Sequence, residues 1–264
     1  MTRHGGRTRR LGAALAALLV AAPGCLSFLH PVDPPRKDMV EPCAALPRCC
    51  RGHVYFFLVH GADPFDAANL GGLNDWVRSL GFPKTYYGQM YHYLYFEGEI
   101  RRLHHEDPDA RFVLMGFSLG ANMVRNIARD VKDEGITIDL MVYCGGNSLA
   151  NDPYNRPENV LQVAHILTQY GSDWMGTPID GADNARVTDV FHFGSPTHLY
   201  TREMLARELA VVAARVPVSA GESGAAPPAE GPRDEWDFLK PAPPPPPAAP
   251  AESIAPPAMP RAEK

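Results

Sequence analysis

The pentapeptide Gly116-Phe117-Ser118-Leu119-Gly120 is the segment whose residue types are best suited to chemistry. It lies between an apolar run at residues 112–115, typical of a buried strand, and residues 121–133, whose apolar side chains recur at helical intervals. Glycines two positions before and after a serine permit a sharp strand-to-helix turn that exposes the hydroxyl. The helix amino terminus favours the negative charge that develops during nucleophilic attack. We therefore expect Ser118 to be a nucleophile.

The elements that must position this serine follow an alternating pattern of short apolar runs and helical spacing. This pattern is typical of βα units around a mostly parallel sheet flanked by helices, an α/β fold. Strands are predicted at residues 53–59, near Tyr86, and at 112–115, 138–143, 160–167 and 185–191; helices are predicted at 73–80, 93–105, 121–133 and 201–216. Residues 145–158 are short, polar and contain proline, so we expect a minimal cap or none, and an open site.

Residues 54–216 resemble the α/β-hydrolase family, in particular its small bacterial lipases and esterases. Besides the serine pentapeptide, Phe57-Leu58-Val59-His60-Gly61-Ala62 is similar to the family's first core strand, which ends in His-Gly. The resemblance implies an α/β-hydrolase-like fold and an oxyanion hole formed by the backbone N–H groups of Ala62 and Leu119. The supporting residues would be His60, Gly61, Gly116 and Gly120.

The same resemblance implies a catalytic acid and a histidine, in that order, after the serine. Asp173 lies in the loop expected for the acid, with Asp180 and Asp183 as competitors in a polar, turn-rich stretch. His192 follows the last predicted strand, and His198 is the fallback. The histidine would take the proton of Ser118, and the acid would fix its tautomer.

The amino terminus is predicted to direct export. Residues 1–24 carry arginines and no acid before the apolar run 11–22, which is typical of a bacterial secretory signal peptide. Either Cys25 is lipidated at a lipoprotein-like box, attaching the chain to a membrane, or the chain is cut near Ala22. The chain is thus expected in the cell envelope, periplasmic or membrane-anchored, or secreted. The net charge is −5, and −9 without the four arginines of this segment, which argues against nucleic acid as a partner.

Residues 25–52 form a Pro- and Cys-containing segment ahead of the hydrolase domain, 53–216. Cys43, Cys49 and Cys50 crowd there, and in an oxidising compartment a disulfide is expected rather than a metal site. The run His104-His105-Glu106-Asp107 is interpreted as a solvated helix end, so no metal and no cofactor are predicted. The tyrosines of residues 86–95 are expected to pack against the sheet rather than line a cleft.

Residues 217–264 are rich in proline and alanine and are predicted to be disordered, because they cannot bury enough apolar area to offset chain ordering. Taken together, the sequence favours a serine hydrolase that cleaves an acyl ester, small or lipidic, as a lipase or carboxylesterase. The alternatives are a thioesterase of the same fold and a non-catalytic envelope protein that keeps the scaffold for binding. Sequence alone leaves the leaving group and acyl chain open, because both depend on pocket shape.

Overall fold

The computed structural model describes residues 26–217, except 147–150, 171–172 and 175. The chain divides into two compact units, Met1–Pro227 and Pro228–Lys264, and every described residue belongs to the first. The predicted signal peptide, Cys25 and nearly all of the Pro- and Ala-rich tail lie outside the described residues. Those three assignments therefore stay predictions.

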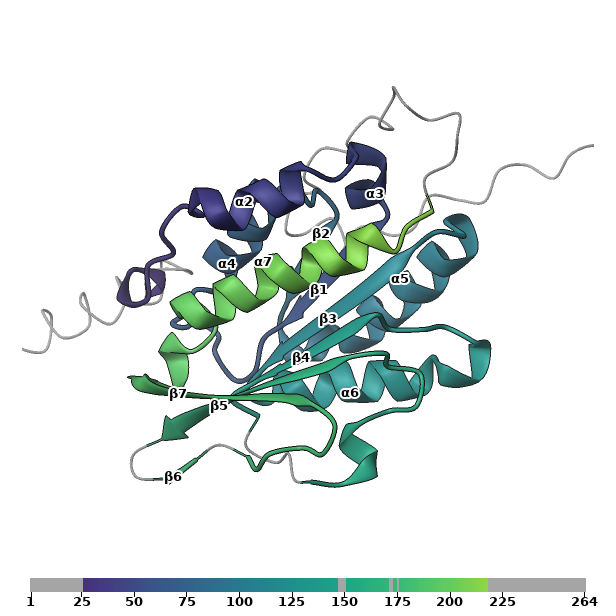
Figure 1. Ribbon diagram of the computed structural model, residues 1–264. Coiled ribbons are helices and arrows are strands. Elements are labelled where there is room, and N and C mark those ends of the chain that lie inside the picture. The colour runs from purple at the N-terminus through teal and green to yellow at the C-terminus, as the bar shows by residue number, and fades with distance from the viewer. Residues whose placement is uncertain (1–25, 147–150, 171–172, 175, 218–264) are drawn as a thin grey trace, which may run out of the picture. The chain divides into compact units, whose positions relative to one another are not determined.

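A seven-stranded sheet forms the centre of the described unit (Figure 1). Its strands are β1 (Val54–Val59), β2 (Thr85–Gly88), β3 (Arg111–Phe117), β4 (Leu140–Cys144), β5 (Val163–Tyr170), β6 (Asp173–Trp174) and β7 (Asp183–Phe191). The order is β2-β1-β3-β4-β5, and β5 also pairs with β6 and β7. Every pairing is parallel except that of β5 with β6. The predicted α/β fold with a mostly parallel sheet is confirmed.

Helices cover both faces of the sheet (Figure 1). One core contains Phe56 and Leu58 of β1 together with side chains of α2 (Lys37–Ala44), α4 (Leu70–Ser79) and α7 (Leu199–Ala214). The other contains Phe57 and Val59 with side chains of α5 (Tyr93–Glu106) and α6 (Gly120–Asp130). Alternate residues of β1 thus serve opposite faces, and both faces are buried, as expected for parallel strands.

The segment before β1 differs from its prediction. It forms η1 (Ser27–Leu29), α2 and α3 (Arg48–Gly52), and the disulfide expected there is wrong: Cys43, Cys49, Cys50 and Cys144 are free thiols. The reason is that α2 docks on α7, where the fully buried Cys43 Sγ lies 3.5 Å from the carbonyl oxygen of Ala206. Cys43 therefore acts as a small apolar core residue.

Little structure is inserted between β4 and β5. In the described residues between these strands, the only helical element is η4 (Pro153–Asn155), in agreement with the expected absence of a large cap. None of the helices in the described ranges has the length and apolar character needed to cross a membrane.

Candidate active site

Ser118 occupies the turn between β3 and α6, at the carboxyl edge of the sheet. Its φ angle is +55°, in the left-handed region that non-glycine residues rarely adopt. The turn is held by a hydrogen bond from the Ser118 N–H to the carbonyl of Cys144 at 2.9 Å, and by another from the Ala121 N–H to the carbonyl of Ser118 at 3.1 Å. The side chain is partly exposed. Strain of this kind persists only where the surroundings fix the backbone, and it is common at functional sites.

Three glycines allow β1 and the β3–α6 turn to approach each other. A Cβ atom at Gly116 would lie 2.4 Å from the carbonyl oxygen of Gly120, and one at Gly120 would lie 2.2 Å from that of Val59. At Gly61 it would lie 2.7 Å from Cβ of Ser118 and 2.8 Å from the Leu119 nitrogen. The turn predicted for Gly116 and Gly120 therefore requires glycine for steric reasons, and Gly61 brings the end of β1 against the serine.

The backbone N–H groups of Ala62 and Leu119, expected to form an oxyanion hole, both lie at this junction. Leu119 caps α6, and Ala62 follows Gly61 in an exposed part of the loop. Neither N–H group donates a hydrogen bond to another residue in the described part of the chain. Both donors are therefore available to an oxygen atom bound beside Ser118.

His192 lies at the same edge, directly after β7. It begins η5 (His192–Gly194), is 5% exposed, and its ring stacks on that of Phe117 with the centroids 4.7 Å apart. Its Nδ1 is 3.4 Å from Oγ1 of Thr168, and a Cβ atom on Gly145 would come within 2.7 Å of the same nitrogen. Burial lowers the pKa of His192 to about 4, and the Asp63 carboxylate opposes this only in part. The imidazole is therefore neutral at neutral pH and able to accept a proton.

The structure brings His192 against Phe117, the residue that precedes Ser118. The hydroxyl of Ser118 makes no hydrogen bond with any other residue in the described part of the chain, whereas the imidazole contacts Thr168 and Phe117. Catalytic hydrogen bonds are often long or absent without substrate and tighten in its presence. Ser118 and His192 thus lie at the same edge of the sheet, and Phe117 is next to both.

The three candidate acids lie at two opposite edges of the sheet. Asp173 lies on β6, opposite Tyr170 at the carboxyl end of β5, and its side chain is outside the described residues. Strand β7 occupies one side of β5 as far as Gln169, so β6 must pair with the other side. On that side β4 ends earlier, and β6 extends the sheet beyond it. Asp183 is exposed at the opposite end, where β7 begins, 3.8 Å from Arg207, and the exposed Asp180 lies three residues before it. Only the backbone of Asp173 is at the edge that holds Ser118.

His198, the fallback for the histidine, is engaged elsewhere. It is the N-cap of α7, where its Nδ1 accepts a hydrogen bond from the Tyr200 N–H at 3.2 Å. Its Nε2 is 3.3 Å from the carboxylate of Asp189. With both ring nitrogens occupied, His198 is suited to capping a helix.

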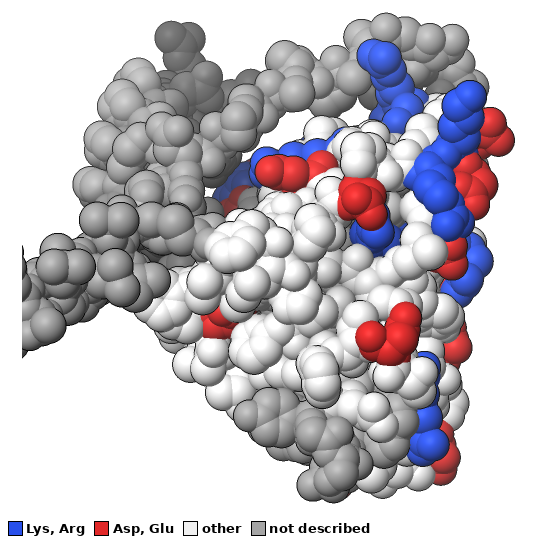
Figure 2. Space-filling model, turned by 90° about the vertical axis from the view of Figure 1, so that its left-hand side faces the viewer, with Lys and Arg blue, Asp and Glu red and all other residues white. Residues whose placement is uncertain are grey.

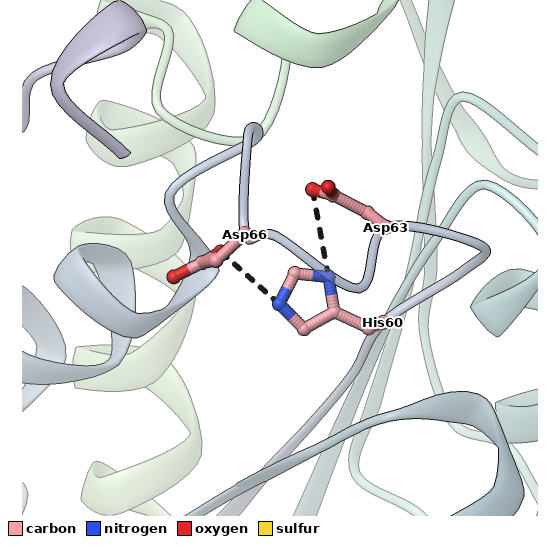
Figure 3. A group of neighbouring side chains, drawn as sticks. All are labelled: His60, Asp63 and Asp66. Carbon is pink, nitrogen blue, oxygen red and sulfur yellow. Dashed lines mark ion pairs between the residues drawn. The ribbon is translucent and has the colours of Figure 1, made fainter. Parts of the chain in front are cut away.

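His60, Asp63 and Asp66 lie close together on the loop that follows β1 (Figure 3), the first two buried and the third partly buried. The imidazole lies between the two carboxylates: Nδ1 is 3.9 Å from Asp63, and Nε2 is 3.1 Å from Asp66 and 2.9 Å from the hydroxyl of Tyr87. One nitrogen of His60 and one oxygen of each carboxylate lie within 4.8 Å of one another. Both carboxylates already accept hydrogen bonds from backbone N–H groups, so we assign the three side chains a structural role.

These carboxylates fix the loop. Asp63 accepts hydrogen bonds from the N–H groups of Ala67 and Ala68, and Asp66 accepts them from Leu70 and Gly71 at the start of α4. Sequence analysis predicted the supporting role of His60 but missed both acids. Two aspartates three and six residues after a strand-terminal histidine were the available signal.

A second polar group occupies the opposite edge of the sheet. There Asp107 is 2.7 Å from Nδ1 of His53 and accepts a hydrogen bond from the hydroxyl of Tyr55 at 2.8 Å. These residues border an open hollow together with Lys84. Because the carboxylate is satisfied by its neighbours and lies at the amino ends of the strands, we assign this group to holding β1 against the start of β3.

No protein-family model matches the chain, and no curated protein matches it. Among solved structures, one of RedJ with a PEG molecule bound in its active site is similar at a TM-score of 0.39 and 10% sequence identity, over 69% of this chain and 93% of that one. At this distance, any functional inference must come from this chain's own residues.

Proposed function

We propose that this protein is a serine hydrolase that cleaves an acyl ester through an acyl-enzyme on Ser118. The observation that carries the proposal is the left-handed backbone of Ser118, at φ +55°, in a strand–turn–helix closed by glycines. A serine gains nothing structurally from this conformation, whereas a nucleophile gains an exposed hydroxyl at a helix amino terminus. The nearby buried imidazole of His192, neutral at neutral pH, supplies a proton acceptor.

In the proposed reaction these groups act in turn. The oxygen of Ser118 attacks the ester carbonyl carbon while His192 takes the hydroxyl proton. The N–H groups of Ala62 and Leu119 donate to the oxyanion that forms. When the carbon–oxygen bond of the ester breaks, His192 gives the proton to the departing alcohol. A water molecule, deprotonated by the same imidazole, then attacks the acyl carbon. The bond from that carbon to the oxygen of Ser118 breaks, His192 returns the proton to the serine oxygen, and the acid is released.

Reaction with a fluorophosphonate, which phosphonylates activated serines, tests this proposal. We expect the full chain to be labelled, Ser118→Ala to remain unlabelled, and His192→Gln to react about 10²–10⁴-fold more slowly. His198→Gln is the matched control and should keep the parent rate, because it removes a cap and no proton acceptor. An unlabelled parent protein would contradict the proposal and favour a binding role for the scaffold.

The same assay identifies the acid. Asp173→Asn is expected to slow labelling strongly, while Asp180→Asn and Asp183→Asn, at the other end of β7, should leave it unchanged. If Asp173→Asn labelled at the parent rate, another residue would have to orient His192. A panel of matched esters and thioesters of increasing acyl length then separates esterase from thioesterase.

A further inference from the structure

Exposed apolar side chains gather at the carboxyl edge of the sheet. We name the apolar rim by six of them: Phe28, Phe65, Tyr91, Leu94, Phe191 and Leu199. Phe65 follows β1, Tyr91 and Leu94 follow β2, Phe191 ends β7, and Leu199 begins α7. Of the large apolar side chains that are exposed in the described residues, only Tyr154, Leu161 and Val211 lie away from this edge.

Phe28 is held at this edge because the neighbouring His30 contacts two loops. Phe28 belongs to η1, after which the carbonyl of His30 accepts a hydrogen bond from the side chain of Asn69 at 2.9 Å. The ring of His30 also approaches Gly194 of η5, so that a Cβ atom there would lie 3.2 Å from it. The start of the described chain is thus fixed beside the loop after β1 and the turn after β7.

Four of the six rim side chains are strongly exposed rather than half-buried. The exposed fractions are 70% for Phe28, 69% for Tyr91, 62% for Leu94 and 74% for Phe191. Their exposure departs in part from the expected packing of residues 86–95, since Tyr91 points into solvent. Contact of such side chains with water is unfavourable in free energy, and covering them with an apolar phase is favourable.

Several segments at the same edge lack charged residues, although Asp189, near the end of β7, is exposed. Residues 26–32, 88–96, 116–122 and 191–201 contain no Asp, Glu, Lys or Arg. In the loop after β1 the acids are Asp63 and Asp66, only 4% and 16% exposed on their side chains. Figure 2, which views the molecule from the side on which the strands end, shows a broad area without charged residues.

We propose that the apolar rim docks on a lipid surface, so that the edge bearing Ser118 faces the membrane. A lipid phase accepts scattered apolar side chains without a complementary shape, and the phenol of Tyr91 suits the boundary between lipid and water. Cys25, which is lipidated in one of the two alternatives that the sequence leaves open, lies three residues before the rim residue Phe28. A lipid at Cys25 would hold this edge against the bilayer. The corresponding substrate class, an acyl ester of a lipid, rests on the proposed hydrolase function, whereas the docking does not.

Flotation with phosphatidylcholine vesicles tests the docking. All chains would carry Leu18→Asp, Val20→Asp and Cys25→Ser, so that the segment before residue 26 neither inserts nor is acylated. The rim variant combines Phe28→Ser, Tyr91→Ser and Leu94→Ser. The control variant combines Tyr154→Ser, Leu161→Ser and Val211→Ser, which removes three apolar side chains that are 41–56% exposed on other surfaces. Circular dichroism and thermal melting establish that both variants fold.

We expect the parent and control chains to bind the vesicles and the rim variant to bind at least tenfold more weakly. Binding should persist at high salt, because apolar contacts rather than charges drive it. Absence of vesicle binding by the parent, or equal binding by both variants, would overturn the proposal. So would a dimeric parent that binds no vesicles and becomes monomeric only in the rim variant. Ser118→Ala should bind like the parent, which separates docking from catalysis.

Discussion

Replacing Ser118 by glycine is expected to make the protein more stable than replacing it by alanine. The φ angle of Ser118 is +55°, and this left-handed conformation costs a residue with a Cβ atom roughly 1–2 kcal/mol. Alanine keeps that cost, whereas glycine does not. Glycine also loses more freedom on folding, which offsets about 0.5–1 kcal/mol of the gain. The net expectation is that Ser118→Gly exceeds Ser118→Ala by about 0.5–1 kcal/mol in the free energy of unfolding.

Urea unfolding of both variants at neutral pH measures this difference. Both variants lack the Ser118 hydroxyl, so the comparison does not depend on catalytic activity. Ser79 provides the control, because it ends α4 in a right-handed helical conformation and its hydroxyl bonds the Trp76 carbonyl. There both substitutions lose the same hydrogen bond, and glycine should be less stable than alanine by about 0.5–1 kcal/mol. If the glycine variant were less stable than the alanine variant at Ser118, as it should be at Ser79, the argument that Ser118 is strained would be refuted.

Three further predictions concern the glycines and the buried histidines. Gly120→Ala should lower the free energy of unfolding by about 3 kcal/mol in urea titrations, since its Cβ would lie 2.2 Å from the Val59 oxygen. The control is Gly98→Ala in α5, where the space is open, and it should not destabilise the protein. Burial lowers the pKa of both His165 and His192 to about 4, so the unfolded chain binds more protons than the folded one between about pH 4 and 6.5. Stability should therefore fall as the pH falls, by about 2 kcal/mol for each histidine at pH 5 relative to pH 7.5, and His165→Gln should remove its share of that difference. The labelling rate of Ser118 should stay nearly constant from pH 7 to about pH 5 and decline below the His192 pKa of about 4; a midpoint near 6.5 would contradict the buried environment of His192.

The sheet and the serine turn were predictable because local patterns determine them. The apolar run at residues 53–59 became β1 within one residue of its predicted start, and the helix expected at 93–105 became α5, Tyr93–Glu106. Strand β3 and helix α6 flank Ser118 as expected. In each case the apolar period alone defines an element and the face that it buries.

The segment before β1 was not predictable in this way. Helix α2 contains Pro42 and shows only Met39 and Cys43 as buried residues, so its apolar pattern is too short to indicate a helix. Its stability comes from docking on α7, more than 150 residues away in sequence. The same contact explains why Cys43 is a buried free thiol. Tertiary packing, which the sequence does not display, decided both outcomes.

The relative positions of the candidate acids also depend on pairing between distant segments. Asp173, Asp180 and Asp183 lie within eleven residues of one another in sequence. The antiparallel turn from β5 into β6 puts the backbone of the first at the carboxyl edge, and the parallel return into β7 puts the last at the amino edge. Strand direction alone separates Asp173 from the other two, although all three have similar local sequence surroundings.

The shortage of exposed charge at this edge affects the proposed chemistry as well as docking. An oxyanion beside Ser118 would meet the N–H groups of Ala62 and Leu119 in a region where the acids of the loop after β1, Asp63 and Asp66, are already bonded to backbone N–H groups. Covering the apolar rim would exclude water from the same region and lower the local dielectric constant, which strengthens the attraction between fixed N–H dipoles and a developing charge. The reaction at Ser118 should therefore be faster at a lipid surface than in solution. A variant that loses only its rim should lose this acceleration and retain its rate on a soluble ester.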